Sequence, residues 1–183
     1  MPLTSVDQLL GKTFEQPDLL GIRRVPMRAT CYSFPDVASA MEAKRDASPW
    51  WHSLDGQWRF LFRESPRDLP EGIEHADASD EGWDDIPVPG CWSMHGYGYP
   101  HYTNVQMPYP DEPPFTPERN PTGVYSRQFE IEPGWAGRRI VLHFGGVEGV
   151  LQVFINGSFV GLSKDSRLPV EFDVTDFVKL DAV

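Results

Sequence analysis

Short segments in which hydrophobic and polar residues alternate recur from about residue 53 onward, and this pattern constrains the fold most. The segment GQWRFLFR (residues 56–63) places the rings of Trp58, Phe60 and Phe62 on one face of a strand. Similar extended segments follow at 124–131, 138–146 and 166–174, with turn residues every eight to twelve positions. This spacing is typical of an all-β fold, and it predicts an antiparallel β-sandwich or jelly roll.

Two local signals refine the expected sheet. Asn156-Gly157 lies between the apolar runs of VLQVFINGSFVGL (residues 150–162) and predicts a two-residue β-hairpin turn. The segment 83–89, WDDIPVP, predicts an edge strand, because proline cannot donate the hydrogen bond that a central strand requires.

The sequence before residue 52 has a different character. We expect residues 1–51 to form an N-terminal arm with one short helix, and residues 52–183 to form the β-sandwich domain. Ser33 is the expected N-cap of the helix, Pro35 lies in its first turn, and Pro49 ends it. The sequence ends at FDVTDFVKLDAV, where a further strand is expected to return to the sheet. We therefore expect the sandwich to lack its last strands in this chain.

A long segment without helical or strand periodicity, Gly90–Tyr125, interrupts the strands. It contains seven prolines, which exclude a long regular element. It is also rich in large apolar side chains, too many for a disordered segment: Trp92, Met94, Tyr97, Tyr99, Tyr102, Tyr109 and Phe115. We therefore predict an ordered loop that presents aromatic rings, with Asn104 at its centre.

Composition excludes several function classes. The net charge of −11 argues against a nucleic-acid partner or an anionic membrane. No stretch is long and apolar enough to span a bilayer, and the N-terminus does not resemble a signal peptide. Cys31 and Cys91 have no metal-binding or redox spacing, so we expect free thiols and a cytoplasmic protein.

The usual catalytic patterns are missing from the sequence. Adjacent acids occur at 80–81, 84–85 and 111–112, but neighbouring residues on a strand or loop point in different directions. We therefore interpret them as solvated surface acids. No nucleophile elbow or histidine pair with metal-ligand spacing is present. Of the five histidines, only His95 and His101, both in the aromatic loop, are candidates for contact with a ligand.

The aromatic loop suits a sugar ligand. A pyranose ring packs its C–H face on aromatic rings, and its hydroxyl groups take directional hydrogen bonds, for which Asn104 offers both a donor and an acceptor. The alternative, which composition alone favours, is that the rings seal an interface with another domain.

Longer motifs resemble a known family. The runs LDGQWRF, PVPGCWSMHGYGYPHYTNVQMPYP, PPFTPERNPTGVYSRQF and FGGVEGVLQVFINGSFVGLSKDSRLPVEFDVTDF resemble glycoside hydrolase family 2, in order and in spacing. More narrowly they are similar to the N-terminal jelly-roll domain of its large bacterial β-galactosidases. The resemblance covers residues 54–178, and less securely the arm before them.

The resemblance implies a role for some residues and excludes others. In this family both catalytic glutamates lie on a separate (β/α)₈ barrel that no part of this chain matches, so we expect no catalytic residue here. The asparagine of YTN, here Asn104, is expected to contact the galactosyl group, with His95, His101 and Tyr102 as further candidate contacts. The resemblance also implies a parent enzyme that uses Mg²⁺ and Na⁺, and an arm that helps to assemble a homo-oligomer.

One implied metal site is in doubt from the sequence. In the family the residue before the aspartate of DSRLP supplies a ligand, but here it is Lys164, a cation. We therefore expect no metal-binding residue in this chain. The expected function is a sugar-binding or scaffold domain that lends a loop to the active site of a retaining β-galactosidase. A free-standing carbohydrate-binding module and a purely structural domain are the alternatives.

Overall fold

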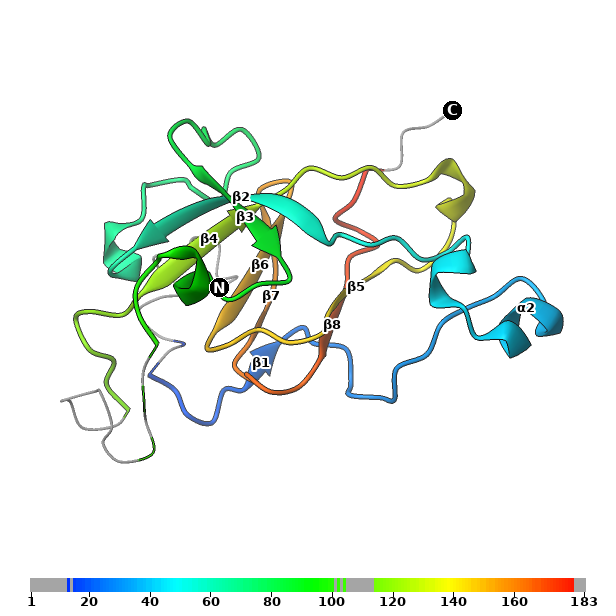
Figure 1. The fold of residues 1–183 in the computed structure, drawn as a ribbon, viewed down its shortest axis with the longest axis horizontal. Coiled ribbons are helices and arrows are strands. Elements are labelled where there is room, and N and C mark those ends of the chain that lie inside the picture. Colours follow the sequence, from blue (N-terminus) through cyan, green and yellow to red (C-terminus); the bar gives the residue numbers. More distant parts are fainter. Residues whose placement is uncertain (1–12, 14, 101, 103, 105–113, 180–183) are drawn as a thin grey trace.

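The structure, a computed structural model, describes residues 13, 15–100, 102, 104 and 114–179 (Figure 1). Antiparallel strands dominate it: β1 (Gly21–Ile22), β2 (Gly56–Arg63), β3 (Asp84–Val88), β4 (Thr122–Ser126), β5 (Val141–Phe144), β6 (Leu151–Ile155), β7 (Ser158–Ser163) and β8 (Val170–Asp173). They form three sheets, with the orders β1-β7-β6, β3-β2-β4 and β5-β8. The described residues contain one α-helix, α2 (Val37–Glu42). The all-β sandwich predicted from the sequence is therefore confirmed.

The main core lies between the sheet of β6 and β7 and the sheet of β5 and β8. Its buried members come from both sheets: Ile140, Val153, Ile155, Val160, Val170, Phe172 and Val174. Phe172 is fully buried, and its ring lies directly against Gly161 of β7. A Cβ atom built on Gly161 would be 2.5 Å from the Cε1 atom of Phe172, so only glycine permits this close approach of the two sheets.

Both local strand predictions are confirmed. Asn156 and Gly157 join β6 to β7, with φ angles of 50° and 78°, as a two-residue hairpin turn requires. β3, which contains Pro87, lies at the edge of its sheet, and β2 lies between β3 and β4. The rings of β2 alternate as predicted, but Leu61 on the opposite face is also buried, with 7% exposure. Both faces of β2 are therefore covered at this point.

The helix begins later than the sequence predicts. Its N-cap is Asp36, whose carboxylate accepts a hydrogen bond from the Ser39 backbone N–H at 2.8 Å. Ser33 was the expected cap, but its carbonyl oxygen instead accepts a hydrogen bond from the Ser48 hydroxyl at 2.6 Å. A carboxylate at the first non-helical position competes well with a hydroxyl three residues earlier.

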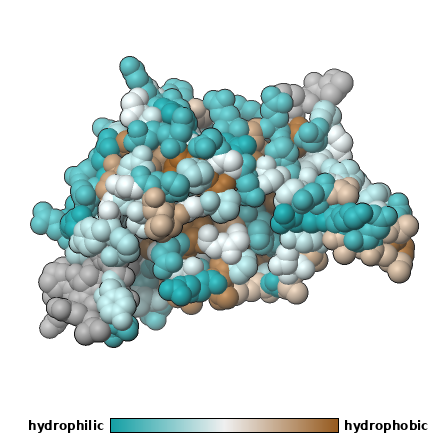
Figure 2. All heavy atoms as spheres, viewed as in Figure 1, coloured by the Kyte–Doolittle hydropathy of each residue, from teal (hydrophilic) through white to brown (hydrophobic). Residues whose placement is uncertain are grey.

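The surface of α2 is unusually apolar for a short exposed helix. Val37 and Met41 are 76% and 82% exposed. Figure 2 shows hydrophobic side chains at the end of the molecule where α2 lies. No helix among the described residues is both long and apolar enough to cross a membrane.

The segment before residue 52 is tied to the sandwich by its own strand. β1 pairs with β7, with Gly21 opposite Ser163, and so forms the outer strand of that sheet. Arg24 forms an ion pair with Asp165 at 2.9 Å, and Arg28 pairs with Glu171 at 2.9 Å. The division of the chain at residue 52 stays a prediction.

Candidate functional site

The first limb of the aromatic loop, residues 90–100, is anchored on β2. Immediately after β3 the chain makes a 3₁₀ turn, Trp92–His95, and the rings of Trp92 and Tyr97 pack on two phenylalanines of β2. The ring centroids of Tyr97 and Phe60 are 4.8 Å apart in an edge-on arrangement, and those of Trp92 and Phe62 are 5.9 Å apart. Such pairs stabilise a contact beyond the area that they bury. The loop therefore starts from a rigid aromatic platform.

A glycine in β4 makes room for this platform. A Cβ atom built on Gly123 would be 2.5 Å from Cζ3 of Trp92 and 2.7 Å from Cε2 of Phe60. These distances are far below van der Waals contact, so the indole ring could not lie across β4 if this residue carried a side chain.

Polar contacts fix the same limb to the edge strand. The Tyr97 hydroxyl donates a hydrogen bond to Asp84 Oδ2 at 2.8 Å, and this bond raises the pKa of the tyrosine. Arg59 pairs with Asp85 at 2.9 Å and with Asp80 at 3.1 Å. The described acid pairs thus hold structure in place, and nothing sets two of them across a common ligand. The pair at 111–112 lies outside the described residues.

The second limb of the loop, residues 114–121, is held by an arginine and by the N-terminal arm. Arg119 pairs with Glu64 at 2.6 Å, and it donates a hydrogen bond to the Tyr99 hydroxyl at 2.9 Å. Further along, Glu15 Oε1 accepts hydrogen bonds from the backbone N–H and the hydroxyl of Thr116, both at 3.2 Å. The arm therefore braces the part of the loop that leads into β4.

The predicted sugar contacts lie on the exposed part of the loop. Asn104 is exposed at a bend, and Tyr102 is 76% exposed. His95 is exposed, and its ring lies close to Gly90, where a Cβ atom would be 3.2 Å from Nε2. His101 lies outside the described residues. The side chains of His95, Tyr102 and Asn104 are all exposed to solvent.

The surroundings of Lys164 do not fit a divalent metal ion. Its Nζ atom donates hydrogen bonds to the backbone carbonyl oxygens of Thr13 and Gln16, the latter at 2.9 Å. The neighbouring carboxylate, Asp165, is engaged with Arg24. A side-chain cation thus occupies the carbonyl oxygens that a metal ion would need. The described residues also contain no group of three or more His, Cys, Asp or Glu side chains that could hold a metal ion.

This arrangement predicts that Mg²⁺ does not stabilise the chain. A ligand that binds only the folded state raises the melting temperature, and we expect no site for one near Lys164. The melting temperature should be the same in EDTA and in millimolar MgCl₂ at matched ionic strength. A saturable rise of several degrees with Mg²⁺, absent with Na⁺, would contradict this expectation.

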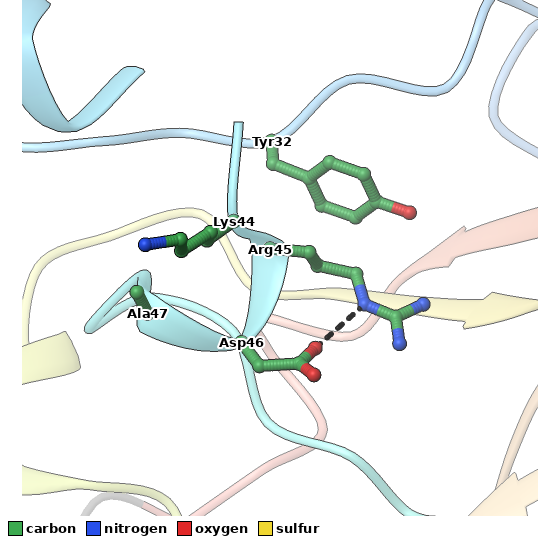
Figure 3. Close-up of a pocket in the computed structure, with 5 residues that line it drawn as sticks. All are labelled: Tyr32, Lys44, Arg45, Asp46 and Ala47. Carbon is green, nitrogen blue, oxygen red and sulfur yellow. Dashed lines mark hydrogen bonds and ion pairs between the residues drawn. The ribbon is translucent and has the colours of Figure 1, made fainter. Parts of the chain in front are cut away.

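One hollow of the surface lies far from the aromatic loop. It has a volume of about 670 Å³ and is lined by residues 32 and 44–47 (Figure 3). In Figure 1 the helix α2, which the 3₁₀ turn Arg45–Ala47 follows in the sequence, lies at the right-hand end of the molecule, whereas β3 lies nearer the middle. The Arg45 guanidinium lies 4.3 Å from the Trp51 ring and pairs with Asp46 at 3.0 Å. Because Arg45 is already engaged, we do not assign a sugar site here.

Sequence reasoning missed the residues that brace the loop. Nothing in the spacing of Glu15 and Thr116, or of Tyr97 and Asp84, indicates that they meet. The only available signal was chemical, since an acid and a hydroxyl group each need a partner when they are partly buried.

Comparisons with known proteins agree with the fold and name its family. The family described as "Glycosyl hydrolases family 2, sugar binding domain" matches residues 51–182. The chain is 38% identical over 177 residues to a β-galactosidase of Yersinia pestis, and equally to one of Yersinia pseudotuberculosis. These alignments cover 96% of the chain but 16% of the relatives, so the chain spans a small part of their length.

Solved structures share the fold at lower identity. A Lactobacillus rhamnosus β-glucuronidase has a TM-score of 0.51 and 24% identity, over 72% of this chain and 19% of that one. A calcium-binding mutant of Bacteroides uniformis β-glucuronidase 2 has a TM-score of 0.52 and 21% identity, over 72% and 13% of the two chains. With the family match over residues 51–182 and the relatives at 38% identity, this chain belongs to glycosyl hydrolase family 2, as its sugar-binding domain.

Proposed function

We propose that this chain is the N-terminal sugar-binding and scaffold domain of a retaining β-galactosidase, which hydrolyses terminal β-D-galactosides such as lactose. The observation that carries the proposal is the 38% identity, over 96% of the chain, to Yersinia β-galactosidases. The two β-glucuronidases described above are 24% and 21% identical to this chain, and their likeness bears on the fold alone. It therefore does not favour a glucuronide as substrate.

The domain's contribution is to position Asn104 and the rings around it. In the proposed enzyme both catalytic carboxylates belong to a separate domain, and they form and hydrolyse a glycosyl-enzyme intermediate. The exposed amide of Asn104 donates to and accepts from the hydroxyl groups of the galactosyl ring. Tyr102 offers an exposed ring face beside it, and His95 a polar edge at the base of the loop. The anchored limbs of the loop limit its motion, so less entropy is lost when the sugar binds.

The remaining parts of the proposal concern partners, ions and location. The exposed Val37 and Met41 of α2 support a contact of the arm with a second subunit. Lys164 does not suit Mg²⁺ or Na⁺, so any such ion that the enzyme uses is held elsewhere than at this residue. Cys31 and Cys91 are both free and exposed, which fits a reducing, cytoplasmic location.

The substrate is tested with the full-length enzyme. Purified enzyme should hydrolyse nitrophenyl β-D-galactoside with a much higher kcat/KM than nitrophenyl β-D-glucuronide. A preference for the glucuronide, or equal turnover of both, would overturn the proposed substrate. A matched assay on the α-galactoside controls for hydrolysis that does not depend on the anomer.

The isolated chain should have no galactosidase activity. No glycosyl-enzyme can form without a nucleophilic carboxylate placed across the sugar from a general acid, and the described acid pairs bind Arg59 and Tyr97 instead. The measurement is hydrolysis of nitrophenyl β-D-galactoside by chain purified from a host without β-galactosidase. Turnover that copurifies with the chain and falls in the Asp84→Ala or Asp85→Ala variant would contradict this prediction.

A further inference from the structure

Lys164 contacts the arm at two separate places. Its backbone N–H donates a hydrogen bond to the Leu20 carbonyl at 3.0 Å, which continues the pairing of β1 with β7. Its side chain reaches back along the arm and donates to the carbonyl oxygens of Thr13 and Gln16. One residue at the end of β7 therefore fixes both ends of a short stretch of the arm.

The ammonium group is committed to these carbonyl oxygens. Among the described residues it forms no ion pair, since the carboxylate of Asp165 binds Arg24. Burial lowers the pKa of Lys164, so the group is partly removed from water. Thr13 itself is 1% exposed. A partly desolvated cation is stable only when it is hydrogen-bonded, and these two carbonyl oxygens supply its acceptors.

The same stretch of the arm carries the acid that braces the loop. Glu15 lies between the two carbonyl groups that Lys164 binds, and its carboxylate accepts both hydrogen bonds from Thr116. Thr116 belongs to the second limb of the loop that bears Asn104. Contacts therefore run without interruption from β7, through Lys164 and the arm, to the loop.

From this series of contacts we infer that Lys164 is a positioning residue for the loop: its ammonium group holds the arm so that Glu15 can brace Thr116. A side-chain cation here links the arm to the sandwich with no bound ion. The effect of Lys164 on sugar binding rests on the proposed role of Asn104. The contact from Lys164 through Glu15 to Thr116 does not. The link can be measured on the chain itself, without any assay of activity.

The experiment is site-resolved amide hydrogen exchange on the chain. Lys164→Met keeps the length and the backbone hydrogen bond to Leu20 but removes the ammonium group. We expect exchange at the Thr116 amide to rise about tenfold, because its acceptor is no longer held in place. Exchange of the core amides of Val160 and Leu162 should stay unchanged. The matched control is Lys179→Met, at an exposed lysine, which should leave Thr116 unaffected.

A second variant separates this link from general loosening. In the Glu15→Ala background the Thr116 amide has already lost its acceptor, so adding Lys164→Met should have no further effect on its exchange. An equal increase in both backgrounds, or an unchanged rate in Lys164→Met alone, would overturn the inference. Either result would leave the proposed galactosidase function untouched, because that function is tested by substrate preference.

Discussion

Replacing Phe60 with alanine should lower the free energy of unfolding of this chain by about 3–5 kcal/mol, the range for a fully buried phenylalanine. Phe60 is 0% exposed in the central strand of its sheet. Its ring lies 4.7 Å from that of Tyr125 and 4.8 Å from that of Tyr97, and it also contacts Trp92. The substitution leaves a cavity and removes the surface on which the loop rests. Chemical denaturation gives the loss directly.

The comparison variant is Phe154→Ala. Phe154 is partly buried on the β6–β7 hairpin, where its ring lies 5.4 Å from that of Phe159. We expect this substitution to cost clearly less, and to leave amide exchange at Tyr97 unchanged, whereas Phe60→Ala should accelerate it. Equal losses of stability in the two variants would show that the aromatic platform has no special role.

The second large effect is expected for Asn104→Ala in the full-length enzyme. Loss of a directional hydrogen bond in a site closed to water leaves polar groups of the sugar unpaired, at about 1–3 kcal/mol. We therefore expect kcat/KM to fall roughly tenfold to a hundredfold. If the hydrogen bond strengthens as the sugar ring flattens in the transition state, the substitution lowers kcat and also raises KM. Because Asn104 is exposed, the melting temperature should hardly change.

The alternative role for Asn104 predicts the reverse. If its amide only braces the loop through backbone hydrogen bonds, the substitution lowers stability and spares the kinetics of each folded molecule. Kinetics on active-site-titrated enzyme, measured alongside the melting curve, separate the two. Unchanged kcat/KM with a clearly lowered melting temperature would assign Asn104 to the structure of the loop. Phe115→Ala, at a 63% exposed residue of the same loop to which no sugar contact is assigned, is the control for nonspecific effects of truncation on the loop.

The parts of the fold that local chemistry dictates were predictable from sequence. Asn156-Gly157 can adopt the positive φ angles of a tight hairpin, and the prolines at 87 and 89 restrict their strand to an edge. The N-cap at Asp36 was missed because Ser33 and Asp36 are both good caps, and only the tertiary contact of Ser33 with Ser48 separates them.

Contacts between segments that are distant in the chain could not be predicted from the sequence. The pairing of Gly21 with Ser163, and the hydrogen bonds from Thr116 to Glu15, join residues more than a hundred positions apart. No periodicity records such a contact, since each residue alone is an ordinary surface type. For the candidate site, the sequence predicted the loop and Asn104, whereas the side chains that anchor the loop became visible only once the strands were placed together.

The anchoring of the loop separates residues that carry its packing from residues whose substitution leaves that packing intact. Trp92 and Tyr97 belong to the packed platform on β2, so a substitution at either position lowers the stability of the domain. Met94 and Tyr102 are 79% and 76% exposed and contribute little to that packing. A library that randomises these two positions, and leaves the platform intact, would explore new glycan preferences on a backbone that still folds.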